Sequence, residues 1–187
     1  MKTALLIIDI QNDYFGNGAM PLCGATKAAE NAGLILAHFR KESKEIIHIQ
    51  HIATRPSATF FLPDTFGAEI HNLVNPLHTE KRITKHFPNS FRDTDLDIHL
   101  KSQEITELVI CGMMTHVCID STVRAAKDFG YNITLIGDAC ATKDLQIGEK
   151  TIPSEEVHYS FLAALNYFYA SVISTKEFLK LNQNELS

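Results

Sequence analysis

The most reactive side chain that the sequence offers is a thiol at a junction between two patterns. An apolar, strand-like run from Leu108 to Ile110 ends at Gly112, and a helical pattern begins near Cys118. A thiol at the start of a helix lies beside unpaired backbone N–H groups, at the positive end of the helix dipole. Both effects favour a thiolate and a nearby oxyanion, so Cys118 could supply a nucleophile and part of an oxyanion hole. A small buried core residue is the alternative interpretation.

Two charged residues close other strand-like runs and could complete a catalytic group with the thiol. Asp9 ends the apolar run over residues 3–9, and Lys85 ends the run over residues 81–85. A lysine ammonium can lower the pKa of a thiol or hold a carboxylate ionised, and a carboxylate can act as a general base. Taken alone, such an aspartate more often caps a turn, and such a lysine is more often a solvated surface charge.

The elements that must position these residues alternate between strand and helix patterns along the chain. Strands are predicted over residues 3–9, 45–51, 81–85, 107–111, 132–137 and 170–174. Helices are predicted over residues 26–43, 68–74, 95–102, 117–129, 154–168 and 176–181. This alternation predicts an α/β fold with three layers, α/β/α, around a mostly parallel, six-stranded, Rossmann-like sheet.

The topology of such a sheet predicts where the three reactive side chains meet. Right-handed crossovers place the carboxyl ends of parallel strands along one edge of the sheet. Ligands bind at that edge, near the point where the strand order reverses. Asp9, Lys85 and the turn after Cys111 fall on it. One edge should therefore gather a carboxylate, an ammonium and the thiol of Cys118.

The length and composition of the chain are those of one globular domain, which we predict to span residues 1–187. Hydrophobic residues make up 45% of the chain and charged residues 21%. A net charge of −5 without a dense Lys/Arg stripe argues against a nucleic-acid partner. No apolar run reaches membrane-spanning length, and the first residues do not resemble a signal peptide. We therefore expect no membrane partner and a cytoplasmic location.

The sequence also lacks the signatures of common cofactor sites. The 4 cysteines form no C-x-x-C pair, which argues against a zinc ribbon or a thioredoxin-like site. His48 and His51, three apart on a predicted strand, should point to opposite faces and so cannot chelate an ion together. No G-x-G-x-x-G follows the first strand. We therefore expect no metal and no other cofactor.

Three blocks of sequence, in this order, resemble the isochorismatase-like cysteine hydrolases, a family that includes nicotinamidase-related amidases. The blocks are residues 5–15, 85–91 and 109–130. The resemblance implies the three-layer fold and a catalytic triad of Asp, Lys and Cys, which falls on Asp9, Lys85 and Cys118. It also implies a cis peptide bond between two consecutive methionines, which would direct the N–H of Met114 into the same oxyanion hole as the N–H of Cys118.

One departure from the family pattern concerns metal binding. The nicotinamidase branch binds a metal through an Asp-x-His pair after the second strand. This chain has His51 and Ala53 at that place. The departure argues against a metal site and against nicotinamide as the substrate.

The resemblance favours a cysteine hydrolase that cleaves a C–N bond of a small amide or ureide through a thioester intermediate. One alternative is an isochorismatase-type hydrolase of a vinyl ether, in which Asp9 is the acid and Cys118 a bystander. The other is a catalytically silent binding subunit. The expected partners are a small-molecule substrate and further copies of the chain, in a dimer or tetramer. The candidate substrate-binding residues, for which core packing is the alternative role, are Phe15, Phe60, Phe87, Phe91 and Thr115.

Overall fold

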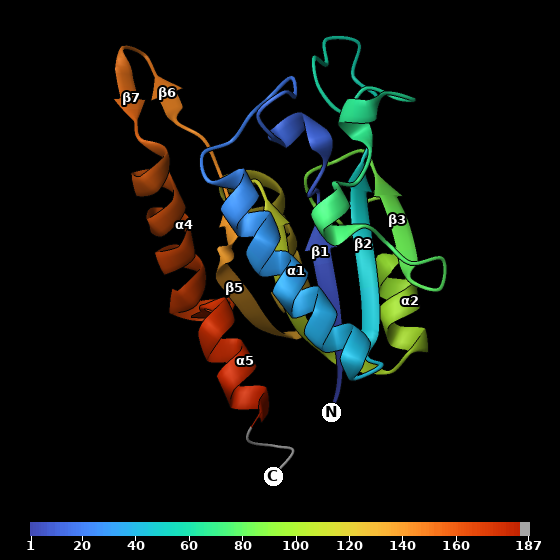
Figure 1. The fold of residues 1–187 in the computed structure, drawn as a ribbon. Helices are drawn as coiled ribbons and strands as arrows, with labels where there is room; N and C mark the ends of the chain where they lie inside the picture. The colour runs from blue at the N-terminus through green and yellow to red at the C-terminus, as the bar shows by residue number, and fades with distance from the viewer. Residues whose placement is uncertain (184–187) are drawn as a thin grey trace.

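A computed structural model describes residues 1–183 of the chain, and its centre is a six-stranded sheet (Figure 1). Every neighbouring pair in this sheet is parallel, and the spatial order is β3-β2-β1-β4-β5-β8. The strands are β1 (Lys2–Ile8), β2 (Glu45–His51), β3 (Lys81–Lys85), β4 (Ile105–Met113), β5 (Asn132–Ala141) and β8 (Ser171–Ile173). The predicted number of strands and their parallel pairing are confirmed.

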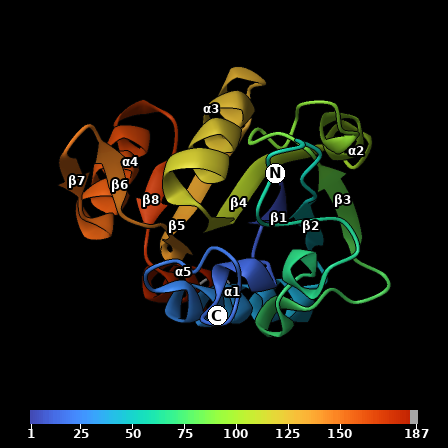
Figure 2. The same cartoon turned by 90° about the horizontal axis from the view of Figure 1, so that it is seen from above.

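Helices cover both faces of the sheet (Figure 2). One face carries α1 (Ala25–Lys41) and α5 (Thr175–Gln183), and the other carries α2 (Leu96–Ser102), α3 (Asp120–Asp128) and α4 (Ser154–Phe168). Successive side chains of a strand point to opposite faces, so the side chains of β1 pack in two hydrophobic cores, one on each face of the sheet. Leu5 and Ile7 pack in the cluster that contains α1, whereas Leu6 and Ile8 pack in the cluster that contains α3. Burial on both faces explains the continuous apolar run.

The strand order reverses between β1 and β4, at the centre of the sheet. From β1 the chain builds outward through β2 to β3, and it then returns to β4 on the other side. At Gly112 the backbone of β4 has φ 136°, and a Cβ atom there would lie 2.0 Å from the carbonyl oxygen of Ile8. Only glycine allows this close approach. The carboxyl ends of the two strands therefore border the crevice in which such sheets bind ligands.

Two predicted helices differ in the structure, and β4 and β5 run beyond their predicted ends, to Met113 and Ala141. The helix expected over residues 68–74 is wrong, because two 3₁₀ turns, η2 (Phe66–Ala68) and η3 (Asn72–Val74), stand there instead. Between them Ile70 pairs with Gln11 in an isolated antiparallel bridge, which holds the intervening chain extended. The helix expected over residues 117–129 begins earlier, with a π turn, η4 (Thr115–Ile119), that leads into α3.

A short hairpin was not predicted. It consists of β6 (Leu145–Ile147) and β7 (Lys150–Ile152), which pair antiparallel. Gly148 adopts φ 57° in the connecting turn, a conformation that glycine allows without strain. Within residues 1–183, none of the helices has the length and apolar character that a membrane-spanning helix requires.

Candidate active site

Asp9 is the first residue after β1, and its backbone turns sharply into the crevice. Its φ is 52°, a left-handed conformation that aspartate tolerates better than most residues. Its N–H donates to the carbonyl of Ile49 at 3.0 Å, and its own carbonyl accepts from Gln11 at 3.0 Å. The side chain is completely buried. The carboxylate is thus fixed at the carboxyl end of the central strand.

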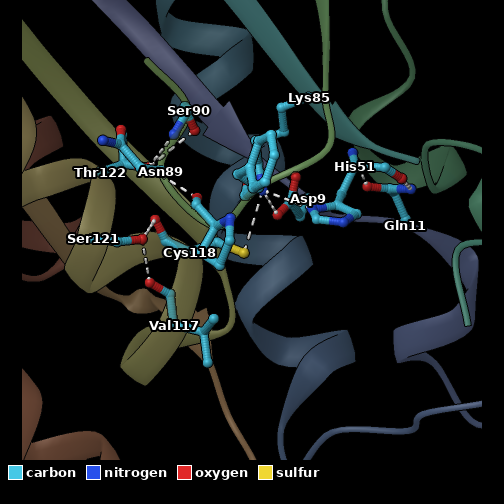
Figure 3. A network of polar contacts seen from close by, with 12 residues as sticks. Asp9, Gln11, His51, Lys85, Asn89, Ser90, Val117, Cys118, Ser121 and Thr122 are labelled. Carbon is cyan, nitrogen blue, oxygen red and sulfur yellow. Dashed lines mark hydrogen bonds and ion pairs between the residues drawn. The ribbon is translucent and has the colours of Figure 1, made fainter. Parts of the chain in front are cut away.

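Lys85, the last residue of β3, sends its ammonium into the centre of the site (Figure 3). Its Nζ lies 2.7 Å from Asp9 Oδ2 and 3.3 Å from Cys118 Sγ, and it also donates to the carbonyl of Phe87 at 3.1 Å. Burial alone lowers the pKa of Lys85, but the charge of Asp9 and, once the thiol is deprotonated, the charge of Cys118 raise it above its ordinary value. The lysine therefore stays charged although it is fully buried.

Cys118 lies inside the π turn that follows β4. The carbonyl of Met114 accepts hydrogen bonds from the N–H groups of Val117 and Ile119, the second of which gives the turn its wider winding. The peptide bond between Met113 and Met114 is cis, at the place that the family resemblance implies. Cys118 is only 4% exposed, and its sulfur points toward Lys85. The three reactive groups predicted to meet are therefore close together.

The surroundings of Cys118 shift the pKa of its thiol in both directions. Burial raises the pKa of the thiol, and the charge of Asp9 raises it further, whereas Lys85 lowers it. The net shift is upward, so the group is a thiol at neutral pH. Burial thus outweighs the lowering of the thiol pKa expected from the helix start and from the ammonium, so formation of the thiolate depends on a nearby base.

His51 is a member of the site that the sequence reasoning missed. It is the last residue of β2 and lies opposite Lys85 in the sheet register. Its Nδ1 is 3.0 Å from Lys85 Nζ. Burial, followed by the charge of Lys85, lowers the pKa of His51 to about 4, so the ring is neutral at neutral pH. Its position at the carboxyl end of a predicted strand was the one signal of the sequence that pointed to this edge of the sheet.

Asp9, His51 and Cys118 also place metal-ligating atoms within 4.8 Å of one another. The donor set alone could hold a cation. However, the Lys85 ammonium contacts all three side chains, at distances between 2.7 and 3.3 Å. The cation that these groups share is the lysine, so the residues do not fit a metal ion while Lys85 occupies this position.

Aromatic residues wall the side of the site near β1. Phe60 is partly buried, with its ring 4.9 Å from Phe61 and 5.9 Å from Tyr14. Phe61 also faces the ring of His51 at 5.9 Å. Burial and then the charges of Cys118 and Asp9 raise the pKa of Tyr14. The sequence indicated the loop of Phe60 and Phe61 as a candidate wall of the site, but the place of Tyr14 beside it was missed.

The other four candidate substrate-binding residues have different surroundings. Phe15 stacks on His71 at 3.7 Å, and Phe87 lies under the guanidinium of Arg92 at 3.6 Å. Phe91 packs against Phe129 and Tyr131 in the core beneath α3. The hydroxyl of Thr115 donates to the carbonyl of Ala141 at 3.2 Å and lies 2.9 Å from His158 Nδ1. The contacts of Phe91 and Thr115 are those of structural residues.

Comparison with known proteins places the chain in a family. The model of the isochorismatase domain matches residues 3–177. The chain belongs to the isochorismatase family of hydrolases. The uncharacterized isochorismatase family protein YddQ of Bacillus subtilis is 54% identical over 180 residues, which cover 96% of this chain and 100% of the relative.

Two further relatives extend the comparison. A structure from Oleispira antarctica, described as an isochorismatase hydrolase, is 45% identical and superposes with a TM-score of 0.92 over 96% of each chain. A nicotinamidase of Escherichia coli is 27% identical over 182 residues, covering 76% of this chain and 84% of the relative. The first similarity extends over nearly the whole fold.

Proposed function

We propose that this isochorismatase-family protein hydrolyses a C–N bond of a small amide or ureide through a thioester on Cys118. The observation that carries the proposal is the Lys85 ammonium, which contacts Asp9 Oδ2 at 2.7 Å and Cys118 Sγ at 3.3 Å in a buried site. A carboxylate, an ammonium and a thiol in mutual contact can move a proton and form a nucleophile. The similarity to a nicotinamidase, an amidase by name, supports the choice of bond.

Asp9 takes the proton of Cys118 as the reaction begins. Its Oδ1 is buried and has no hydrogen-bond partner among residues 1–183, so it can accept a proton. A thiol with a raised pKa needs such a base, since little thiolate exists at neutral pH. Lys85 keeps the carboxylate and the nascent thiolate in one charge-compensated cluster.

The covalent steps then follow from the positions of these groups. The sulfur of Cys118 bonds to the carbonyl carbon, and the N–H groups of Met114 and Cys118 bind the oxyanion, each contributing about 3 kcal/mol. Asp9 returns the proton to the leaving nitrogen as the C–N bond breaks. Water then attacks the thioester with Asp9 as the base, which releases the acid and restores the thiol.

A second candidate is the hydrolysis of a vinyl ether, with Asp9 as the proton donor and Cys118 as a bystander. The observation that favours it is the raised pKa of Cys118, because a neutral thiol does no chemistry by itself. The contact between Lys85 and the sulfur favours the cysteine route, since an acid mechanism has no use for it. Removal of the thiol separates the two candidates.

The test is a panel of small primary amides, ureides and isochorismate, assayed with the wild-type protein and Cys118→Ala. The proposal expects at least one amide or ureide to be hydrolysed by the wild type and none by Cys118→Ala. Cys140→Ala is the matched control, because Cys140 is also a buried thiol but bonds to the carbonyl of Ile136. It should retain the activity.

Three other outcomes would each redirect the assignment. Hydrolysis of isochorismate that survives in Cys118→Ala supports the acid mechanism. Full hydrolysis of an amide by that variant contradicts the nucleophile. No turnover by the wild type, together with a thiol that does not react, supports a binding subunit.

We further propose a homo-oligomer, which light scattering after size-exclusion chromatography would test.

A further inference from the structure

We propose that His51 orients the substrate, with Nδ1 accepting a hydrogen bond from Lys85 and the N–H at Nε2 donating to an acceptor beside the reacting carbonyl. The inference rests on the proposed function and makes it more specific. It identifies the substrate class as an acyl compound with a second acceptor, such as another carbonyl oxygen, close to the scissile bond.

The hydrogen bond to Lys85 determines which nitrogen of His51 carries the proton. A lysine ammonium has donors and no acceptor, so the ring nitrogen 3.0 Å from Nζ must offer a lone pair. That nitrogen is Nδ1. In a neutral imidazole the proton then resides on Nε2. The low pKa of His51, caused first by burial and then by Lys85, agrees with a neutral ring.

The backbone of His51 is held rigidly by Gln11. The N–H of His51 donates to Gln11 Oε1 at 2.8 Å, and Gln11 Nε2 donates back to the carbonyl of His51 at 2.9 Å. Gln11 is completely buried and also donates to the carbonyl of Ala68 at 2.7 Å. With its backbone clamped and its Nδ1 bonded to Lys85, the ring has one orientation (Figure 3).

The other ring nitrogen is free to contact a ligand. Within residues 1–183, Nε2 of His51 makes no hydrogen bond. This atom is also not completely buried, so a ligand can reach it. The side chain is partly buried, whereas Asp9 and Lys85 are completely buried. His51 is therefore the side chain of this group that can offer a donor to an entering molecule.

The reach of this donor sets the substrate class. A ring nitrogen of His51 lies within 4.8 Å of both Cys118 Sγ and a carboxylate oxygen of Asp9. A carbon that bonds to the sulfur must lie beside this group. Both nitrogens belong to the same small ring, and a hydrogen bond extends the reach of Nε2 by about 3 Å. An acceptor one or two atoms from the reacting carbon falls within that range.

The experiment compares two alkylating reagents, iodoacetamide and iodomethane, on Cys118. Each forms an S–C bond and releases iodide, but only iodoacetamide has a carbonyl acceptor beside the reacting carbon. The ratio of the two rates cancels the thiolate fraction, which is common to both. Peptide mapping by mass spectrometry would measure the rate at Cys118 in the wild-type protein and in the variants.

The variants separate the two nitrogens of the ring. His51→Gln can keep an N–H near the position of Nε2, whereas His51→Asn keeps only a short side chain that can accept at the position of Nδ1. We expect the rate ratio to fall roughly fivefold in His51→Asn, the effect of one neutral hydrogen bond, and to stay within about twofold in His51→Gln. His86→Asn is the matched control, because His86 is exposed and bonds to the carbonyl of Ile52.

The outcomes distinguish the inference from the function on which it rests. If His51→Asn keeps the wild-type ratio while Cys118 reacts, the substrate-orienting role is refuted and the hydrolase survives. If neither reagent alkylates Cys118, the accessible nucleophile is refuted, and the inference goes with it. Should His51→Asn not fold, nitrogen–proton NMR correlations of the wild type decide, because a proton on Nδ1 of His51 at neutral pH would overturn the proposal.

Discussion

Replacement of Asp9 by asparagine should abolish hydrolysis and yet make Cys118 easier to deprotonate. The carboxylate is the proposed proton carrier, so turnover should fall by about 10²- to 10⁴-fold. The charge of Asp9 also contributes, after burial, to the raised pKa of Cys118. Without it, Lys85 has one anionic partner to stabilise in place of two. Asparagine tolerates the left-handed backbone at this position.

The size of the pKa change follows from the geometry. An oxygen of Asp9 lies within 4.8 Å of Cys118 Sγ. At an effective dielectric constant of about 20, two like charges at that distance repel by about 3.5 kcal/mol. Removal of the charge on Asp9 should therefore lower the thiol pKa by about 2.5. A thiolate of lower pKa is less nucleophilic, with a Brønsted slope of about 0.45. The net gain in alkylation rate at mildly alkaline pH is therefore about 20-fold.

Iodoacetamide labelling of Cys118, followed by mass spectrometry across the pH range, measures this gain. Asp93→Asn is the control, because Asp93 also has a positive φ of 55° but its side chain is 71% exposed. It should leave both the rate and the hydrolysis unchanged. An Asp9→Asn protein whose Cys118 reacts no faster than the wild type would refute the electrostatic coupling, and full hydrolysis by it would refute the proton transfer.

Three further predictions concern stability. Burial alone raises the pKa of Glu80, but hydrogen bonds, first of all from Arg40, lower it to about 2. The ionised Glu80 therefore stabilises the fold at pH values above its ordinary pKa of 4.5, and this contribution is lost as the pH falls toward 2. Glu80→Gln should flatten the loss of stability over this range in urea unfolding, and an unchanged slope would contradict the ion pair. Asp13→Ala leaves the N–H of Phe61, now bonded to Asp13 Oδ2 at 2.6 Å, without a partner, and should cost about 1–3 kcal/mol in denaturant unfolding. A cost below the error of that measurement would dismiss this bond. Gly112→Ala should lower the melting temperature strongly, since its Cβ would overlap a carbonyl of β1 in a left-handed conformation, and a wild-type melting temperature would be inconsistent with that approach.

The parts of the fold that the sequence predicted well are those with strong local patterns. The bounds of β2 match the prediction, because its buried apolar centre is flanked by polar residues. The bounds of β3 match as well, although this edge strand alternates between exposed and buried residues. The helix α4 also matches its predicted range. The topology predicted that Asp9, Lys85 and Cys118 lie near one another, since each lies at or after the carboxyl end of a parallel strand.

The parts that were missed depend on contacts between distant segments. The chain around Ile70 is extended because it pairs with Gln11, and nothing in its local pattern reveals that bridge. His51 joins the site through its register with Lys85, which a strand pattern does not contain. The state of the Cys118 thiol depends on how deeply it is buried, and no spacing of residues gives that depth.

In the proposed mechanism Cys118 carries the acyl group, Asp9 accepts and returns the proton of the thiol, and Lys85 stabilises the charges of both. The most direct test is intact-protein mass spectrometry after acid quenching of turnover with whichever amide or ureide of the panel reacts. We predict a wild-type adduct with the mass of the acyl group, located on Cys118 by peptide mapping and absent in Cys118→Ala. Steady hydrolysis of that substrate by Cys118→Ala, with no adduct on either protein, would contradict the account.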